Sequence, residues 1–266
     1  MVRQRQRQQN KKISLVIAIA NQKGGVGKTN VTFNLSGALA EKNQKILLID
    51  LDQQGNLSSV FLDSIYNLKI TVADILLDDD IPVLRAIQKT SFQNIDIIPS
   101  NIDLSKIDLQ LAGEPDAQYF LVDKLKEIKA SYDYTIIDCP PSLGLATRIG
   151  LVAADKVIIP LECQEWAVKG TAHLRGAIAK IRKRANPQLK IMGYLINRYD
   201  GRRKLEEVYR DTILESFKDK VFKVELKSSV KYVEAATFKK PITTYLPVSQ
   251  YAEVYRRLAE EILDYG

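Results

Sequence analysis

The sequence predicts an α/β protein with a doubly wound, mostly parallel sheet and helices on both faces. Three observations point to this class. Short apolar runs rich in β-branched residues alternate with longer, helix-length segments, which is typical of strands joined by crossover helices. The apolar runs are almost continuously hydrophobic, as expected of strands covered on both faces. A chain of 266 residues with 45% hydrophobic residues is long enough for one large domain of this kind.

Six apolar runs are the predicted strands, and five longer segments are the predicted helices. No internal repeat, Pro/Gly/Ser-rich linker or long heptad run interrupts them. We therefore expect a single domain at residues 13–266, preceded by a disordered basic tail at residues 1–12. The predicted strands are Ile13–Ala20, Ile46–Ile49, Ile95–Ile98, Tyr134–Ile137, Val157–Ile159 and Ile191–Ile196, and the predicted helices are Asn30–Lys42, Asp116–Lys129, Val168–Arg184, Arg202–Phe217 and a last one from Ser249 to about Leu263.

The composition excludes several classes of protein. A hydrophobic share of 45% argues against intrinsic disorder, and the two cysteines, Cys139 and Cys163, are too few for a disulfide scaffold. No apolar run approaches the roughly 20 residues that a membrane helix needs. The basic start of the chain is followed by a strand-like run without a cleavage pattern, so it is not a secretory signal. We expect a soluble, cytoplasmic protein.

The net charge of +7 is distributed unevenly along the chain. Residues 1–12 carry a net +5, residues 169–240 carry 19 basic and 8 acidic residues for a net +11, and the remainder sums to −9. Such a segregated excess raises the local positive potential, which favours polyanions such as nucleic acid or an acidic membrane surface. The alternative is that these Lys and Arg side chains only solvate exposed helices.

A glycine-rich loop joins the first predicted strand to the first predicted helix. Its sequence is NQKGGVGKTN over residues 21–30, so it supplies the strand, loop and helix N-terminus of a nucleotide phosphate site. The glycines let backbone amides converge on the β-phosphate, and Lys28 can reach the β- and γ-phosphates. The Thr29 hydroxyl can ligate Mg²⁺. The loop therefore predicts ATP and Mg²⁺ as ligands.

Two further predicted strands are followed by carboxylates, which a phosphate site needs to organise Mg²⁺ and the attacking water. Asp138 ends the fourth predicted strand and precedes CPPSLG over residues 139–144, a restricted loop suited to coupling the γ-phosphate state to shape. Asp50 and Asp52 follow the second predicted strand. An Asp after a strand is also a common turn former or helix cap, which is the alternative at these positions.

The spacing of the glycine loop departs from that of an ordinary P-loop. Gln22 occupies the place of the first glycine, and Lys23 comes next. The run KGGVGKT over residues 23–29 resembles the deviant Walker A motif of the ParA/MinD group of ATPases. The segment that begins at Asp138 resembles the DxPPxxG segment of the same group.

The resemblance extends over nearly the whole chain, from about Ile13 to Leu263. GYLINRYDGR over residues 193–202 is similar to the family's next strand and loop, and Glu234-Ala235 and Lys240-Pro241-Ile242 are similar to its C-terminal signature. The chain is therefore identified as resembling a ParA/Soj-type partition ATPase. That group includes McdA-like members that position carboxysomes.

The resemblance implies a P-loop NTPase fold and roles for individual residues. Lys23 is expected to reach the phosphates of a partner subunit across a dimer interface, where a second cation neutralises transition-state charge; the alternative is a solvated loop lysine. Asp52 is expected to assist hydrolysis, and Asp50 to have a structural or Mg²⁺-shell role. The implied catalytic residues are Lys23, Lys28 and Asp52, the implied Mg²⁺ ligands are Thr29, Asp50 and Asp138, and the implied ATP-binding residues are Lys23, Gly24, Gly25, Val26, Gly27, Lys28, Thr29, Asn30 and Asn197.

Two residues depart from the family pattern near the expected nucleotide. The chain has Gln53 where the family usually has Pro, and Asn30 where it often has Thr. We expect these changes to alter turnover while ATP binding survives, and we expect slow hydrolysis without a partner. Asn197, at the carboxyl end of a predicted strand, is a candidate to bind the adenine edge. The alternative is a buried, turn-forming Asn.

The basic segment brings no base-reading motif, so binding through phosphates would be salt-sensitive and nearly sequence-blind. In ParA-type proteins, basic residues in corresponding regions bind DNA non-specifically once ATP has closed the dimer. The resemblance also implies an adaptor that stimulates hydrolysis, ParB-like or otherwise, nucleoid association, and a cargo such as a plasmid, a chromosome locus or a carboxysome. The expected DNA-binding residues are Arg182, Lys183, Arg184, Arg202, Arg203, Lys227 and Lys231.

Two rival functions share the same glycine loop. A MinD-like, membrane-recruited ATPase would end in a basic amphipathic helix, whereas acidic residues outnumber basic ones after Arg257, so we expect no membrane partner. A metal-cluster carrier or maturation ATPase would want a Cys pair, and Cys139 and Cys163 do not form a CxxC. We assign no role to the lone His173. The identity of cargo and adaptor, the rate of hydrolysis and the role of the N-terminal tail do not follow from the sequence.

Overall fold

The computed structural model describes residues 14–265 of the chain. The predicted basic tail at residues 1–12 lies outside these residues. Seven strands of the described part form one sheet in the order β3-β4-β2-β5-β1-β6-β7, and every pairing is parallel except that of β3 with β4. The strands are β1 (Leu15–Ile19), β2 (Ile46–Asp50), β3 (Gln88–Lys89), β4 (Ile95–Ile98), β5 (Tyr134–Asp138), β6 (Lys156–Leu161) and β7 (Lys190–Ile196).

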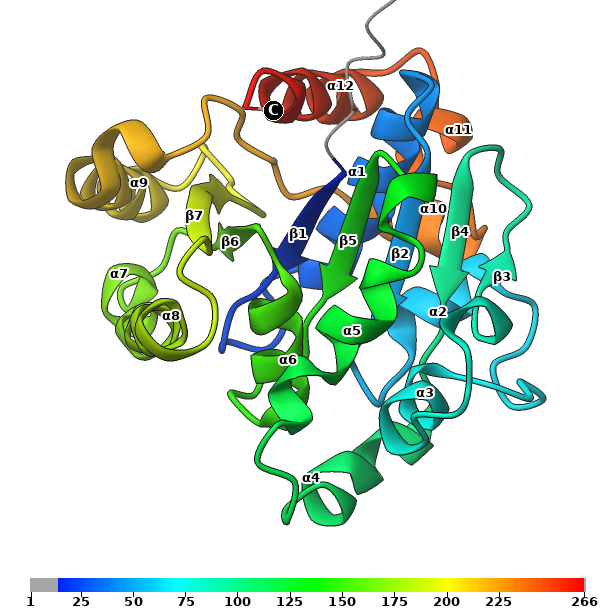
Figure 1. Ribbon diagram of the computed structural model, residues 1–266. Helices are drawn as coiled ribbons and strands as arrows, with labels where there is room; N and C mark the ends of the chain where they lie inside the picture. Colours follow the sequence, from blue (N-terminus) through cyan, green and yellow to red (C-terminus); the bar gives the residue numbers. More distant parts are fainter. Residues whose placement is uncertain (1–13, 266) are drawn as a thin grey trace, which may run out of the picture.

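Helices connect the strands and cover both faces of this sheet, as the sequence predicts. In Figure 1, α5 and α6 lie in front of the strands and α1 lies behind them. The helices are α1 (Lys28–Glu41), α2 (Asn56–Phe61), α3 (Val72–Leu77), α4 (Ile107–Gln110), α5 (Phe120–Lys126), α6 (Leu145–Ala153), α7 (Ala167–Gly170), α8 (Ala172–Arg184), α9 (Lys204–Phe217), α10 (Val230–Thr237), α11 (Ile242–Tyr245) and α12 (Gln250–Leu263).

The central strands are buried on both faces, which explains their continuous hydrophobicity. All five residues of β2 are buried, and successive side chains enter two different cores. Leu47 and Ile49 pack in the core beneath α3, α5, α6 and α8, whereas Ile46 and Leu48 pack in the core beneath α1 and α12. A strand with two buried faces can be apolar at every position, so alternation is lost and only length and β-branching mark it.

Several elements differ from the prediction. The predicted helix Val168–Arg184 is split into α7 and α8 at Thr171, whose hydroxyl donates to the carbonyl of Val168 at 2.8 Å. A hydroxyl that bonds back to the chain competes with the helical pattern, and the preceding Gly170 favours helix weakly. The predicted helix Asp116–Lys129 is regular only over α5, with 3₁₀ turns on both sides. Short elements such as β3 and α2–α4, and also α6, α10 and α11, were not predicted.

The last helix packs on the core as expected. Tyr255 on α12 is fully buried, and Arg256 binds Glu41 of α1 at 2.8 Å. The buried residues of α12 form one face, and it is occupied by α1 and α11. Among the described residues, no helix combines the length and apolarity that crossing a membrane requires.

Gly37 lets the segment around Pro241 approach α1. A Cβ at Gly37 would lie 2.4 Å from the Cβ of Pro241 and 3.0 Å from the hydroxyl of Thr243. Gly176, on the exposed side of α8, is also inside a helix, but a Cβ there would meet nothing within 4 Å. Both glycines are therefore inside helices, but a side chain would be crowded at Gly37 and unobstructed at Gly176.

We expect the same substitution to have opposite effects at these two positions. Gly176→Ala should raise the free energy of unfolding by about 0.5–1 kcal/mol, because alanine favours helix more than glycine does. Gly37→Ala should lower it by about 1–3 kcal/mol, because crowding against Pro241 outweighs the same gain. Urea denaturation of both variants measures the difference. A Gly37→Ala variant as stable as Gly176→Ala would contradict the packing described here.

Candidate active site

The glycine loop and the predicted carboxylates meet at one edge of the sheet. The loop follows β1 and leads into α1, while Asp50 and Asp138 end the strands β2 and β5. Asp138 is in register with Asp50 on one side and with Ile19 of β1 on the other. The carboxyl edge of a doubly wound sheet is where such folds bind ligands.

The carbonyl groups of the loop are tied to other parts of the protein, while its N–H groups are left open. Within the part of the chain that the structure describes, the N–H groups of residues 24–30 have no acceptor. Such a row of free donors at a helix N-terminus is suited to an anion. The carbonyls of Lys23, Gly25, Val26 and Gly27 accept from the Lys28 ammonium (3.5 Å), the Arg198 guanidinium (2.7 Å), the Asn197 amide (2.7 Å) and the Val31 N–H (2.9 Å), respectively.

Glycine is required where the loop turns into α1. Gly25 and Gly27 have φ angles of 78° and 84°, in the left-handed region that favours glycine. A Cβ at Gly27 would also lie 2.5 Å from the amide nitrogen of Asn197. Gly27 is therefore required both by its backbone conformation and by the close approach of Asn197, whereas Gly25 is required by its backbone conformation alone.

Lys28 supplies a buried cation next to the free N–H groups. Its side chain is only 7% exposed, and burial lowers the pKa of its ammonium, a shift that the charge of Asp138 opposes. A buried ammonium is costly unless an anion accompanies it. The free N–H groups of the loop and the ammonium of Lys28 therefore both favour an anionic ligand.

Asp138 lies beneath Thr29 at the start of α1. The Thr29 hydroxyl donates to the Asp138 carboxylate at 2.6 Å, and the Thr32 hydroxyl is 3.4 Å from its other oxygen. The carboxylate is 1% exposed, and burial, followed by the nearby charge of Asp50, raises its pKa. Two adjacent buried carboxylates with one partly compensating lysine favour a bound cation.

Asp50 is used to hold the following loop in place. Its carboxylate accepts from the N–H of Asp52 at 3.0 Å and from the N–H and hydroxyl of Ser58 at 2.9 and 2.7 Å. It is fully buried, and burial raises its pKa although these hydrogen bonds oppose the shift. Asp50 thus anchors α2 to the end of β2, while its direct contact with a metal stays a prediction.

The oxygen donors fit Mg²⁺ that is shared with a phosphate. Thr29 and Asp138 offer a hydroxyl and a carboxylate, the hard ligands that Mg²⁺ prefers. The described residues contain no group of three or more His, Cys, Asp or Glu side chains able to hold a metal by themselves. Mg²⁺ is commonly held by one or two protein oxygens together with substrate phosphates and water. The two oxygen donors of Thr29 and Asp138 are therefore enough on the protein side for such a shared Mg²⁺.

A cavity of about 500 Å³ opens in front of the loop. It brings together Lys28, Thr29 and Asp52, although Asp52 comes from a different strand end. The Asp52 carboxylate accepts from the N–H of Gln54 at 3.0 Å, which fixes one of its oxygens. Pro141, from the loop after Asp138, lines the same cavity. The side chains predicted to bind phosphate and to assist hydrolysis therefore face one space.

A second cavity of about 340 Å³ adjoins the first at Gly27 and Asn30. Asn197 lines it, but both ends of its side chain are engaged, since it donates to Val26 and accepts from the N–H of Arg198 at 3.0 Å. The Asn30 oxygen is likewise engaged, with Asn34 at 3.2 Å. Contacts of Asn197 and Asn30 with a nucleotide stay predictions. The rest of the lining consists of Arg198, Lys227, Ser228, Ser229, Val230, Tyr232 and Val233.

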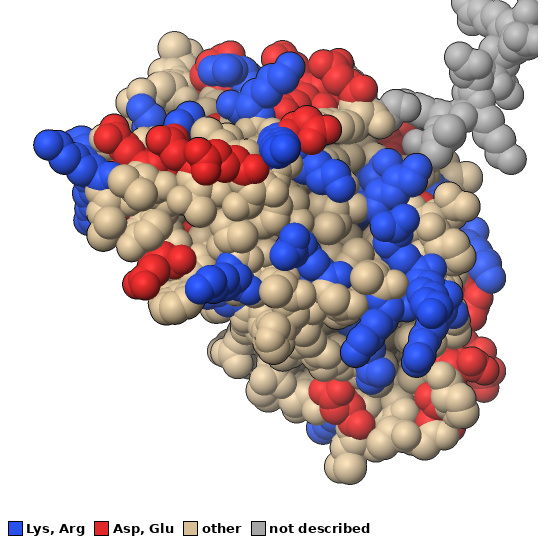
Figure 2. All heavy atoms as spheres, turned by 90° about the vertical axis from the view of Figure 1, so that its left-hand side faces the viewer, with Lys and Arg blue, Asp and Glu red and all other residues tan. Residues whose placement is uncertain are grey.

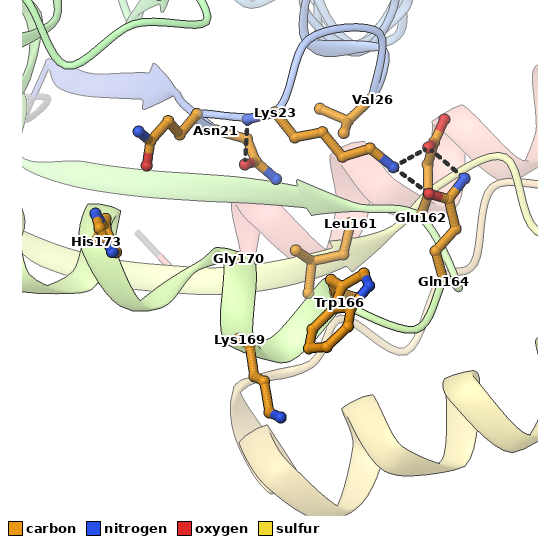
Figure 3. A pocket seen from close by; sticks show the side chains of 12 residues that line it. Asn21, Lys23, Val26, Leu161, Glu162, Gln164, Trp166, Lys169, Gly170 and His173 are labelled. Atoms are coloured by element: carbon orange, nitrogen blue, oxygen red, sulfur yellow. Dashed lines mark hydrogen bonds and ion pairs between the residues drawn. The ribbon is translucent and has the colours of Figure 1, made fainter.

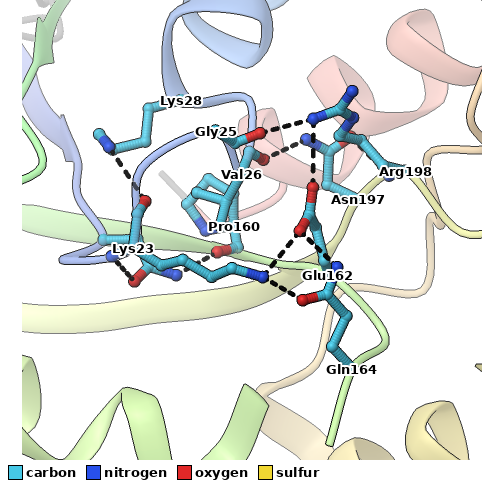
Figure 4. Close-up of polar contacts among 10 residues, drawn as sticks. Lys23, Gly25, Val26, Lys28, Pro160, Glu162, Gln164, Asn197 and Arg198 are labelled. Carbon is cyan, nitrogen blue, oxygen red and sulfur yellow. Dashed lines mark hydrogen bonds and ion pairs between the residues drawn. The ribbon is translucent and has the colours of Figure 1, made fainter. Parts of the chain in front are cut away.

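Lys23 points away from its own phosphate loop. Its ammonium binds the Glu162 carboxylate at 2.9 Å and the Gln164 side-chain oxygen, and its side chain is half exposed (Figures 3 and 4). Glu162 also binds Arg198 at 3.2 Å. Glu162 and Arg198 are members of the site that the sequence pattern does not predict. The signal available was that each follows a predicted strand, the same position from which Asp50 and Asp138 were found.

The expected DNA-binding residues do not form one uniform patch. Arg182, Lys183 and Arg184 are exposed in the last turn of α8 and make no ion pair within the described residues. Figure 2, which views the face carrying α7–α9, shows Lys and Arg gathered on one side of it and acidic residues along its upper part. The others are placed differently: Arg202 and Arg203 bind Asp200, Lys231 binds Glu234, and Lys227 lines the second cavity.

The two cysteines have no site of their own. Both are buried, and burial raises the pKa of the Cys139 thiol far above its usual range and that of Cys163 to about 12. The thiol form is the unreactive one, so neither group is activated near neutral pH.

Comparisons with known proteins show the family to which the chain is similar. Residues 14–191 match the model of a family described as an AAA domain. The chain is 39% identical to the sporulation initiation inhibitor protein Soj of Bacillus subtilis, covering 94% of this chain and 99% of Soj. It is 38% identical to the chromosome partitioning protein ParA of Caulobacter vibrioides, covering 93% of each.

A solved structure provides the corresponding comparison in three dimensions. The chain matches cobyrinic acid a,c-diamide synthase from Mycobacterium smegmatis, solved with bound ADP and magnesium, with a TM-score of 0.83 and 30% identity. The match covers 95% of each chain. The doubly wound fold predicted from the sequence is therefore confirmed.

We expect Asp138→Asn to stabilise the protein in the absence of nucleotide and Mg²⁺. The amide oxygen can still accept from Thr29, while one of two neighbouring buried charges is removed. Differential scanning fluorimetry should show a melting temperature higher by about 2–4 °C for each 1 kcal/mol gained. The exposed control Asp63→Asn should show no change. A lower melting temperature for Asp138→Asn would mean that the charge is already compensated.

Proposed function

The chain belongs to the ParA/Soj family of partition ATPases, and on this premise we propose that it is an ATP-dependent, dimerising ATPase that binds nucleoid DNA non-specifically. In this proposal ATP closes two copies face to face, the dimer binds DNA, and hydrolysis stimulated by an adaptor releases it. Such a cycle positions or segregates a cargo, either a plasmid or chromosome locus or a protein body such as a carboxysome. The adaptor is ParB-like or an equivalent protein.

One observation carries the proposal for ATP binding. The N–H groups of residues 24–30 have no acceptor within the described residues, whereas the carbonyls of Gly25 and Val26 are paired with Arg198 and Asn197. All residues of the run 24–30 except Val26 line one cavity, which also contains the buried ammonium of Lys28. Backbone donors held in place before the ligand arrives need no reorganisation when it binds. Thr29 and Asp138 would hold Mg²⁺ next to the phosphates.

The same residues explain how hydrolysis would proceed. Mg²⁺, when bound, neutralises charge on the phosphate oxygens. Lys28 and the loop N–H groups stabilise the charge that develops on the transferred phosphoryl group. Asp52 faces the same cavity and accepts a hydrogen bond from the attacking water, which orients the water toward phosphorus. Gln53, exposed beside Asp52, leaves this loop less restricted than the usual proline would, in keeping with slow turnover.

Dimerisation supplies a role for Lys23. Within one chain its ammonium is bound to Glu162 and Gln164, away from the cavity that holds Lys28. We infer that it exchanges these contacts for the phosphates of a second subunit when two copies close on ATP. Half of the side chain is already exposed, so the exchange requires little rearrangement.

The proposed DNA contact centres on α7 and α8. Residues 167–184 contain six basic residues and no acidic residue. Gly176 and Ala179 are exposed on α8 between these cations, so the helix surface is flat enough for a phosphate backbone to approach. Arg202, Arg203, Lys227 and Lys231 are proposed as separate contacts: the first two and Lys231 are paired with acidic residues, and Lys227 lines the second cavity.

The membrane-recruited alternative has less support. A terminal helix that enters a lipid interface must expose its apolar face. The apolar face of α12 is instead packed on α1 and α11. We therefore propose DNA as the polyanion.

The experiment that tests the whole proposal is retention of the protein on non-specific double-stranded DNA with ATP, with ADP and without nucleotide. Retention should require ATP and should be lost in Lys23→Ala, which cannot complete the dimer. Binding that is equal with ADP and ATP, or that survives loss of both Lys23 and Lys28, would overturn the switch. Sedimentation with anionic liposomes but no retention on DNA would favour the membrane-recruited alternative.

We expect Asp52→Ala to separate ATP binding from hydrolysis. Loss of the water-orienting carboxylate should slow hydrolysis by about 100-fold or more, while ATP affinity stays within about threefold because Lys28 and the loop are unchanged. Phosphate release and fluorescent ATP-analogue titration measure the two quantities. Asp123→Ala, which removes an exposed carboxylate on α5, is the control. Wild-type turnover by Asp52→Ala would show that another group orients the water.

Removing the cations at the end of α8 should weaken DNA binding more than removing the same charge elsewhere. The triple variant Arg182→Ala, Lys183→Ala, Arg184→Ala should reduce the slope of log affinity against log salt by about 3 for each subunit that contacts DNA. The charge-matched control is Lys106→Ala, Lys126→Ala, Lys129→Ala, on another part of the surface. Equal losses in both triples would mean that net charge, and not a patch, governs binding.

A further inference from the structure

Two consecutive side chains at the end of β7 hold two consecutive carbonyls of the phosphate loop. Asn197 donates to the carbonyl of Val26 and Arg198 to that of Gly25, each at 2.7 Å (Figure 4). The loop and β7 are far apart in sequence, and no motif places them together. The sheet order, with β1 and β7 both next to β6, brings them side by side.

Holding these carbonyls determines where the neighbouring N–H groups point. The C=O and N–H of one trans peptide unit are coplanar and point in opposite directions. A fixed Gly25 carbonyl therefore fixes the N–H of Val26, and a fixed Val26 carbonyl fixes the N–H of Gly27. Both N–H groups belong to the row that has no acceptor in the described residues.

We propose that Arg198 is a positioning residue for the phosphate-binding loop, acting through the Gly25 carbonyl to aim backbone N–H groups at the β-phosphate. This inference rests on the proposed nucleotide binding and adds to it a residue that acts through its contact with the loop. Glu162 holds Arg198 in place. Its carboxylate, only 13% exposed, lies 3.2 Å from the Arg198 guanidinium.

The backbone of Arg198 is consistent with such a task. Its φ angle is 57°, in the left-handed region that residues other than glycine rarely adopt. The Arg198 N–H is held at 3.0 Å by the side chain of Asn197, so the unusual conformation is supported locally. Strained backbone that the surroundings maintain is concentrated at functional sites. Stability alone does not explain this conformation well, because the Arg198 side chain is 55% exposed and exposed ion pairs contribute little to the free energy of unfolding.

Because the backbone of Arg198 is left-handed, a glycine variant can remove the contact with the Gly25 carbonyl without straining the fold. Arg198→Gly deletes the guanidinium and is relaxed at this φ angle, so its melting temperature should equal or exceed that of the wild type. Arg198→Lys keeps the cation, but its ammonium lacks the planar geometry and the reach of the guanidinium Nη1 that donates to both Gly25 and Glu162. The exposed residue Arg257 on α12, changed to Ala, is the matched control for loss of charge.

The test compares affinities for ADP and AMP in the presence of Mg²⁺, measured by calorimetric titration. Arg198→Gly should bind ADP about tenfold more weakly, the effect of one charge-assisted hydrogen bond, and should bind AMP within twofold of the wild type, because AMP has no β-phosphate. Arg198→Lys should recover part of the ADP affinity. Arg257→Ala should change neither affinity.

Three outcomes would overturn parts of the account separately. Unchanged ADP affinity in Arg198→Gly would overturn the positioning role alone. Equal losses for ADP and AMP would do the same, because they would show general disturbance of the site. A wild-type protein that binds neither ADP nor ATP would overturn the proposed function, and the inference with it.

Discussion

The unpaired N–H groups of residues 24–30 are the constraint on which the rest of the site depends. The first N–H groups of a helix have no partner within the helix, and within the described residues this row has no acceptor while the loop carbonyls accept from Lys28, Asn197 and Arg198. Because Gly24 and Gly25 are exposed and Gly27, Thr29 and Asn30 are half-buried, a ligand can reach these donors, and an anion suits them. Lys28 lies beside the same opening and Asp138 beneath it, so phosphate and Mg²⁺ would satisfy donors, ammonium and carboxylate together.

Most of the fold and half of the site follow from the sequence, for physical reasons. The strands were found because burial on both faces demands continuous apolar residues, and the loop was found because a phosphate cradle needs glycines at fixed spacing. Asp138 and Asp50 were found because they end strands of one parallel sheet. Arg198 and Glu162 were missed because their importance lies in contacts with Gly25 and Lys23, which depend on strand order and leave no local pattern.

The positions of the basic residues on the surface show which part of the net charge is available to a ligand. The net +11 of residues 169–240 does not form one continuous field. Arg202, Arg203 and Lys231 are bound to acidic partners, whereas the last turn of α8 carries three cations without ion pairs in the described residues. One chain therefore carries a small patch, and the proposed dimer would carry two copies of it, which is how the proposed closure would strengthen a weak contact with DNA.

The most direct test of the account is the behaviour of the loop amides themselves. Amide nuclear magnetic resonance of the wild-type protein, titrated with ADP and Mg²⁺ and separately with adenosine, reports on each N–H group of residues 24–30. The account predicts large shifts for these amides with ADP and none comparable with adenosine, because the phosphates supply the missing acceptors. Shifts of the same size with both ligands, or ADP shifts confined to other parts of the chain, would contradict it.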